Sequence, residues 1–168
     1  LLSTEPSGEA LQPAGNAPRV MHSEDLKIWF PIKTGLMRRT TDYIRAVDGI
    51  TVDVRVGQTV GVVGESGSGK TTLGLALLRL ITSDGPIKFD GHHLDDLKSK
   101  QLRPLRREMQ IVFQDPYGSL SPRMSIAQII EEGLKVHKIG NKPADRDTLI
   151  VQAMEEVGLD PASRYRYP

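Results

Sequence analysis

A glycine-rich stretch at residues 64–72, Gly-Glu-Ser-Gly-Ser-Gly-Lys-Thr-Thr, constrains the fold of this chain more than any other feature. The apolar run 59–63 precedes it and the leucine-rich segment 73–81 follows it, which predicts the order strand, glycine loop, helix. Two glycines with four residues between them, followed by Lys and Thr, form the P-loop pattern, which holds the phosphates of a nucleotide. A flexible Gly/Ser turn is the alternative, and the flanking strand and helix argue against it.

Each position of the loop has a physical task. Glycine lacks a Cβ, so the backbone can turn through positive φ and wrap closely around a polyphosphate. The amides of residues 67–71 lie at the start of the helix and are expected to point inward, toward a bound phosphate. Unpaired N–H donors and the positive end of the helix macrodipole favour an anion at this place. Lys70 is expected to reach the β- and γ-phosphates, and the Thr71 hydroxyl to ligate Mg²⁺. The predicted nucleotide-binding residues of the loop are Gly64, Glu65, Ser66, Gly67, Ser68, Gly69, Lys70, Thr71 and Thr72.

The motif alone leaves the nucleotide open between ATP and GTP, and the reaction open between hydrolysis and kinase-type transfer. With 168 residues, 38% of them hydrophobic and 26% charged, the chain suits one globular domain. The net charge of +1 gives no bulk attraction to nucleic acid or to an anionic membrane. The absence of cysteine excludes disulfides and thiolate metal sites.

No apolar run approaches the roughly 20 residues of a membrane span, and no signal peptide is visible, so a cytosolic setting is the default expectation. The chain begins with Leu1 rather than Met and stops at Pro168, directly after a helix-like segment. This suggests an excerpt from a longer polypeptide.

The chain before the glycine loop predicts a linker and an antiparallel layer. Residues 1–22 contain scattered Pro and Gly and no periodic apolar pattern, which predicts a linker or tail. Residues 26–30 predict a strand that Pro31 ends or places at an edge, and residues 50–56 alternate as a half-buried antiparallel strand does. Residues 33–41 form a basic, hairpin-like loop that can meet phosphate or lipid, although a solvated loop is favoured.

The chain after the glycine loop predicts short elements. Asp-Gly-Pro at 84–86 should break the first helix, and residues 87–89 predict a strand that an Asp-Gly turn follows. His92 and His93 come next, but they predict no metal site because neighbouring side chains at a strand end point apart and no partner ligand lies at a usable spacing.

The last third of the chain predicts one more strand and three helices. Residues 99–108 predict a short or broken helix, and residues 110–115 a buried strand that ends in a polar loop. Residues 124–136 and 149–157 carry apolar side chains at helical spacing, and Gly158 should end the second of these helices.

Two motifs together resemble the nucleotide-binding subunit of ABC transporters: the glycine loop and Val-Phe-Gln-Asp-Pro at 112–116. Residues 90–91, 109–116 and 117–124 look like the oligopeptide/dipeptide importer branch of that family. The resemblance covers about residues 24–168. Its details look closest to the second ATPase domain of the fused, double-ATPase subunit of Yej-type importers of peptides and microcin C, so the Pro/Gly-rich start would connect to a first ATPase domain.

The resemblance implies an α/β fold of the P-loop NTPase, ABC ATPase type. The chain would hold the N-terminal part of that domain: an antiparallel β layer, the P-loop core and the start of the helical subdomain. The implied division is a linker over residues 1–22 and a partial nucleotide-binding domain over 23–168, with the helical subdomain from about residue 117.

The resemblance also implies what the chain as given lacks. The Ser-Gly-Gly-Gln signature, the strand that ends in Asp-Glu (Walker B) and the switch histidine do not occur in it, so no complete catalytic set is present and binding of Mg-ATP without turnover is expected. In the family, later strands lie between the P-loop strand and the glutamine strand. Here both strands are therefore expected to expose unpaired edges and apolar faces, which predicts marginal stability for this chain alone.

Two further residues receive roles from the resemblance. Gln114 occupies the place of a glutamine that contributes to Mg²⁺ and to the attacking water, so Thr71 and Gln114 are the expected metal ligands and Lys70 and Gln114 the expected catalytic assistants. A Gln that caps a strand end is the alternative. Phe30 is the candidate for stacking on adenine, with Tyr43 second, and core packing of Phe30 is the alternative.

As a whole, the resemblance implies an ATPase subunit that powers import of short peptides or peptide-like compounds, peripheral to the cytoplasmic face of the inner membrane. The implied partners are the transporter's membrane subunits, a second ATPase domain fused upstream and, indirectly, a periplasmic binding protein. An ABC-type ATPase that acts on nucleic acid is one alternative, but residues 115–168 hold neither a coiled coil nor a zinc module, and no nucleic-acid partner is expected. A truncated, non-catalytic remnant is the other.

Overall fold

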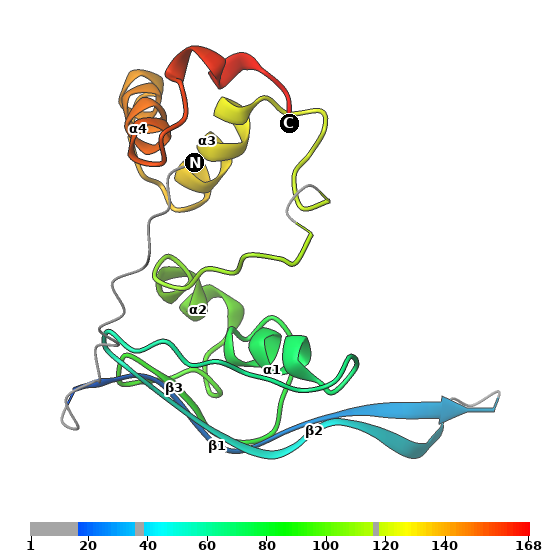
Figure 1. Cartoon of the computed structure of the whole chain (residues 1–168). Coiled ribbons are helices and arrows are strands. Elements are labelled where there is room, and N and C mark those ends of the chain that lie inside the picture. Colours follow the sequence, from blue (N-terminus) through cyan, green and yellow to red (C-terminus); the bar gives the residue numbers. More distant parts are fainter. Residues whose placement is uncertain (1–16, 36–38, 116–117) are drawn as a thin grey trace, which may run out of the picture. The chain divides into compact units, whose positions relative to one another are not determined.

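The computed structural model describes residues 17–35, 39–115 and 118–168, which divide into two compact units (Figure 1). The first unit reaches Leu102 and the second begins at Arg103. The first strand begins at Arg19, inside the range predicted as a linker, whereas residues 1–16 lie outside the described residues. The predicted start of a helical subdomain near residue 117 also lies outside them, so that division stays a prediction.

An antiparallel sheet with the strand order β2-β1-β3-β4 frames the first unit. Strand β1 (Arg19–Thr34) pairs with β2 (Arg39–Arg55) as a long hairpin, and its first half also pairs with β3 (Ile87–Phe89), which pairs with β4 (His92–His93) (Figure 1). The antiparallel layer and the strand at residues 87–89 are thereby confirmed. The hairpin expected around residues 33–41 is confirmed at both ends, and its residues 36–38 lie outside the described part.

Pro31 lies inside β1 and not at its end. Lys27 exchanges two backbone hydrogen bonds with Asp84, each 2.8 Å, on the side of β1 away from β2. Because alternate residues of a strand direct their backbone groups to the same edge, the missing N–H of Pro31 falls on that side as well. Among the described residues only β2 pairs with β1 there, so Pro31 occupies an edge position, where no ladder bond is lost.

Helix α1 (Lys70–Leu77) packs on β1 and β2 and covers the core of the first unit. It ends before the predicted residue 81 because Arg79 adopts φ 55° and the amides of Arg79 and Leu80 bond the carbonyls of Ala76 and Leu75. This is the Schellman pattern, which closes a helix through one left-handed residue. The buried apolar side chains of the unit are Leu26, Ile28, Val47, Leu73, Ala76, Ile87, Phe89, Leu94 and Leu102.

Two predicted strands are absent from the described residues. Residues 59–63 and 110–115 lie outside every sheet, and Val63 and Val112 are 96% and 90% exposed. A strand needs a neighbour for its backbone hydrogen bonds, and the described sheet offers none to either run. The prediction of two buried strands, one before and one after α1 in the sequence, is therefore wrong for this chain. The expectation that both apolar runs are exposed is confirmed.

Helices form the second unit. Helix α2 (Ser99–Leu105) ends just inside it, and α3 (Ile126–Val136), α4 (Pro143–Glu156) and the 3₁₀ helix η1 (Pro161–Tyr165) follow. Helix α4 begins earlier than residue 149 because a proline at its first position and the Asp145 carboxylate, which accepts from the Lys142 amide at 3.1 Å, open it.

The three expected helices of this region are confirmed, and Gly158, with φ 74°, ends α4 as predicted. Ile150 and Met154 of α4 are buried in this unit. Among the helices that the structure describes, none has the length and apolar character that crossing a membrane requires.

Candidate functional site

The glycine loop leads directly into the N-terminus of α1. Gly69 is the N-cap residue with φ 89°, and Gly67 has φ 80°, so both occupy the left-handed region that glycine enters without a Cβ penalty. No side-chain hydrogen bond caps this helix end within the described part of the chain. The turn through positive φ is confirmed, and the open helix end faces the loop.

The backbone amides of the loop are available for a ligand. Among the described residues, none accepts a hydrogen bond from the amides of Gly67, Gly69, Lys70 or Thr71. The amide of Ser68 is the exception in the predicted arc, because it donates to the Glu65 carbonyl at 3.2 Å. Unpaired donors at the positive end of a helix attract an anion, and a phosphate oxygen satisfies several of them at once.

Lys70 lies across the loop. Its Nζ is 2.8 Å from the carbonyl oxygen of Gly64, 2.5 Å from that of Glu65 and 3.4 Å from the Ser68 hydroxyl. These partners are neutral, so the ammonium charge is not cancelled by a carboxylate. A phosphate that enters the loop therefore replaces weak dipolar partners with a charge-assisted one.

Strand β2 packs against the glycine loop at Gly69. A Cβ on Gly69 would lie 2.1 Å from the carbonyl oxygen of Ala46 and 3.4 Å from Val47 Cγ2, so no residue other than glycine fits. Ala46 lies at an irregularity of β2, between the pairs Ile28 with Val47 and Trp29 with Arg45. Sequence reasoning missed this contact because the alternation that predicted a strand covers only residues 50–56.

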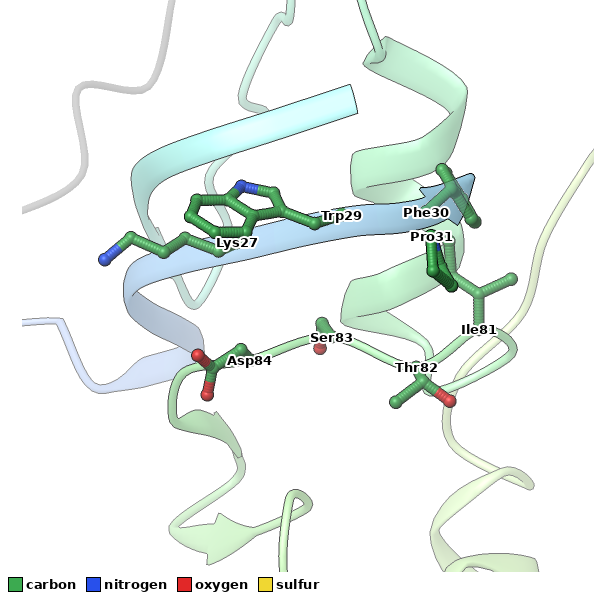
Figure 2. Close-up of a pocket in the computed structure, with 8 residues that line it drawn as sticks. All are labelled: Lys27, Trp29, Phe30, Pro31, Ile81, Thr82, Ser83 and Asp84. Atoms are coloured by element: carbon green, nitrogen blue, oxygen red, sulfur yellow. The ribbon is translucent and has the colours of Figure 1, made fainter. Parts of the chain in front are cut away.

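Phe30 lines a pocket to which the glycine loop does not contribute. It lies in β1 opposite Ile44, is 43% exposed, and lines a pocket of about 700 Å³ with Trp29, Pro31 and residues 81–84 (Figure 2). No residue of 64–72 lines this pocket. Stacking of Phe30 on adenine therefore stays a prediction.

Tyr43, the second candidate for that role, packs against Trp29, with 6.0 Å between ring centroids and 54° between ring planes. At the same pocket, the hydrogen bond from Lys27 to Asp25, 2.6 Å long, raises the pKa of Lys27 above its ordinary value. Lys27 therefore stays charged at neutral pH.

The two predicted metal ligands lie in different units. Thr71 belongs to the first unit and Gln114 to the second, in the exposed run that precedes a turn. The Asp115 carboxylate accepts from the Gly118 amide at 3.0 Å, and the Asp115 carbonyl accepts from the Ser119 hydroxyl at 2.7 Å. Joint coordination of Mg²⁺ by Thr71 and Gln114 stays a prediction.

One grouping was not expected from the sequence. The ligand atoms of His93, Asp95 and Asp96 lie within 4.8 Å of one another, so the expectation that no partner lies near the histidines is wrong. Asp95 already accepts from the Ile87 amide at 3.0 Å and lies 3.9 Å from His93 Nδ1. These contacts fix the turn around β3 and β4, which gives the group a structural role.

The whole chain was compared with known proteins. The model of the ABC transporter family matches residues 47–167. The peptidoglycan transport ATP-binding protein YejF of Agrobacterium fabrum is 60% identical over 168 residues, which is 100% of this chain and 31% of that protein. The glutathione import ATP-binding protein GsiA of Salmonella typhimurium is 45% identical over 140 residues, or 83% of this chain and 22% of that protein.

The chain thus spans less than a third of the length of these relatives, 31% and 22%. Among solved structures, the ATP-binding cassette MJ0796, a dimer bound to ADP and Pi, matches with a TM-score of 0.71 at 22% identity, over 89% of this chain and 62% of that one. The shared fold is the N-terminal part of a P-loop ATPase domain. On the family match over residues 47–167, this chain belongs to the ABC transporter family.

Proposed function

We propose that residues 64–72 bind the triphosphate of ATP. The observation that carries the proposal is the set of unpaired amides at Gly67, Gly69, Lys70 and Thr71, in an arc that opens at the N-terminus of α1. The Lys70 ammonium adds a mobile positive charge beside this arc. Unpaired amide donors suit phosphate oxygens, and the positive helix end favours their negative charge.

Mg²⁺ is the metal that this loop suits. The Thr71 side chain is exposed at the first turn of α1, and no described residue forms a hydrogen bond with its hydroxyl. Mg²⁺ prefers oxygen ligands and keeps several waters, so one hydroxyl, the Gln114 amide oxygen and phosphate oxygens form a reasonable set. When bound, the ion would neutralise phosphate charge. The chain itself supplies the amides and Lys70, which orient the phosphates.

For the full-length protein we propose an ATPase that powers import of short peptides or peptide-like compounds. It would be peripheral to the cytoplasmic face of the inner membrane and act with membrane subunits, an upstream second ATPase domain and, indirectly, a periplasmic binding protein. The support is the family match, the transport and import named for YejF and GsiA, and the 31% share of YejF that this chain covers. Hydrolysis would use the family's signature and acidic strand, which this chain lacks.

The substitution Lys70→Ala in the full-length protein tests the loop. Without the Lys70 ammonium, the β- and γ-phosphates each lose one charged hydrogen bond, worth roughly 1.5 kcal/mol. Binding of a fluorescent ATP analogue should therefore weaken by about 100-fold. Lys100→Ala, a change of an exposed lysine on α2, is the matched control and should bind as the parent does. Equal affinity of the Lys70→Ala protein and its parent would refute the assignment of the loop.

A further inference from the structure

The outer half of the β1–β2 hairpin exposes apolar side chains on both of its faces. We define this distal ribbon as residues 29–34 and 39–45. Figure 1 shows it extending past α1. Its large apolar side chains are all 37% to 59% exposed: Trp29, Phe30, Ile32, Tyr43 and Ile44.

The pairing register separates these side chains into two faces. Trp29 pairs with Arg45, whereas the next pair along the strands is Phe30 with Ile44. Because successive side chains of a strand point to opposite faces, Trp29, Tyr43 and Arg45 share one face. The other face carries Phe30, Ile32 and Ile44, together with Asp42. A ribbon of two strands cannot bury both of its faces by itself. The inner half differs, since Ile28 and Val47 are buried in the core.

Contacts with Arg45 and with Asp48, just outside the ribbon, hold the Trp29 ring in place without covering it. The Arg45 guanidinium lies 4.8 Å from the centroid of the Trp29 ring, and the Trp29 Nε1–H donates to Asp48 at 3.1 Å. Trp29 nevertheless stays 40% exposed, and Tyr43, packed against it, 48%. The rings are thus held in place and face outward.

The ribbon also concentrates positive charge. It holds three cations, Lys33, Arg39 and Arg45, against one carboxylate, Asp42, for a net charge of 3 − 1 = +2. Asp48, just outside the ribbon, lies 3.9 Å from the Arg45 guanidinium and offsets one of these charges. Lys33 and Arg39 lie at the outer end of the paired strands, and no described residue forms an ion pair or hydrogen bond with either side chain. This end therefore presents two uncompensated cations.

We infer that the distal ribbon binds the surface of a bilayer that contains anionic lipids. Aliphatic side chains enter the acyl boundary, Trp and Tyr rings sit at the headgroup level, and Lys and Arg contact anionic headgroups. The ribbon would thus hold the proposed ATP-binding unit at the membrane by a contact separate from its protein partners.

Trp29 makes the inference directly testable because it is the single tryptophan of the chain. The full-length protein, purified without its transporter subunits, is mixed with vesicles of phosphatidylcholine alone or with about 30% phosphatidylglycerol. The emission of Trp29 is recorded as the difference from a Trp29→Phe variant. Emission should shift to the blue only with the anionic vesicles, and lipids brominated on their acyl chains should quench it. Raising the salt from about 0.1 M to 1 M, which shortens the Debye length from about 10 Å to 3 Å, should weaken binding.

Matched charge reversals separate the ribbon from general electrostatics. Each cation near an anionic surface is worth about 1 kcal/mol, or roughly fivefold in affinity, so Lys33→Glu with Arg39→Glu should lower vesicle affinity by at least about 25-fold. Lys98→Glu with Lys100→Glu, an equal charge change at exposed positions of the same unit, should leave it unchanged.

Flotation of the full-length protein, purified without its transporter subunits, with the same vesicles and substitutions is the second measurement. The proposal predicts flotation with anionic vesicles that depends on Lys33 and Arg39. Three results overturn it: no blue shift with anionic vesicles, equal loss in both double variants, or failure of the full-length protein to float. The last would leave a protein partner as the occupant of the ribbon.

Discussion

Substitution of Gly69 by alanine tests the contact that positions the phosphate-binding loop. Two features of the structure oppose a side chain at this position. The backbone has φ 89°, and a Cβ would lie 2.1 Å from the carbonyl oxygen of Ala46 in β2. A carbon and an oxygen cannot approach that closely, so the loop or β2 must move by about 1 Å. Either movement displaces the amides at the start of α1.

The magnitude follows from these two terms. A left-handed conformation costs a residue with a Cβ roughly 1–2 kcal/mol, and forcing an extra carbon into a filled space costs about 1–3 kcal/mol more. We therefore expect Gly69→Ala to lower the free energy of unfolding of the first unit by about 2–5 kcal/mol. Binding of an ATP analogue should be lost in the same protein.

Two other glycines serve as matched controls. Gly67 has φ 80°, but a Cβ there meets nothing within 4 Å, so Gly67→Ala should cost only the backbone term of about 1–2 kcal/mol. Gly74 lies inside α1 with open space around its Cβ, so Gly74→Ala should stabilise the protein by about 0.5–1 kcal/mol. The three variants are thus expected to change the free energy of unfolding by different amounts, and Gly74→Ala in the opposite direction.

Urea unfolding of the three variants, followed by circular dichroism, measures the differences. Nucleotide binding is read separately with a fluorescent ATP analogue in the full-length protein. If Gly69→Ala and Gly67→Ala lower the stability equally, the contact with Ala46 contributes nothing and the steric argument is wrong. Retained nucleotide binding in Gly69→Ala would likewise contradict a positioning role for β2.

Two further predictions concern the second unit. Hydrogen bonds from Lys135 at 2.8 Å and Arg146 at 2.9 Å hold the pKa of Glu131 below its ordinary value, so its stabilising effect is present above the unfolded pKa and lost as the pH falls through the folded one. The urea midpoint should therefore fall less between pH 7 and acid pH in Glu131→Gln than in the parent, and parallel curves would contradict this. Ser125→Ala removes the cap that accepts from the Gln128 amide at 3.4 Å and should cost about 1 kcal/mol in the same assay, whereas the exposed change Thr148→Ala should cost less.

Features that depend on near neighbours along the chain could be predicted from the sequence. The positive φ of Gly67 and Gly69 and the helix that starts at Lys70 follow from residue types within one short segment. Helices α3 and α4 follow from apolar spacing, and the end of α4 follows from Gly158. Helical hydrogen bonds join residues four apart, so local sequence contains the information that decides them.

Features that depend on contacts between distant residues could not be predicted from the sequence. Residues 59–63 have the composition of a buried strand, yet they lie outside the described sheet because a strand forms only beside a partner that other parts of a chain provide. For the same reason the sequence did not reveal that β2 extends back to Arg39, or that Phe30 lines a pocket to which the glycine loop does not contribute.

By itself, the sequence determined the chemistry of the phosphate-binding loop: its glycines, its lysine and the helix that follows. Only the tertiary structure decided what holds that loop in place. The carbonyl of Ala46, which packs against Gly69, belongs to strand β2, and β2 precedes the loop in the chain. It also decided that Trp29, Tyr43 and Arg45 of the distal ribbon share one face. Both results arise from cross-strand pairing and packing between distant segments, which no local pattern of residues encodes.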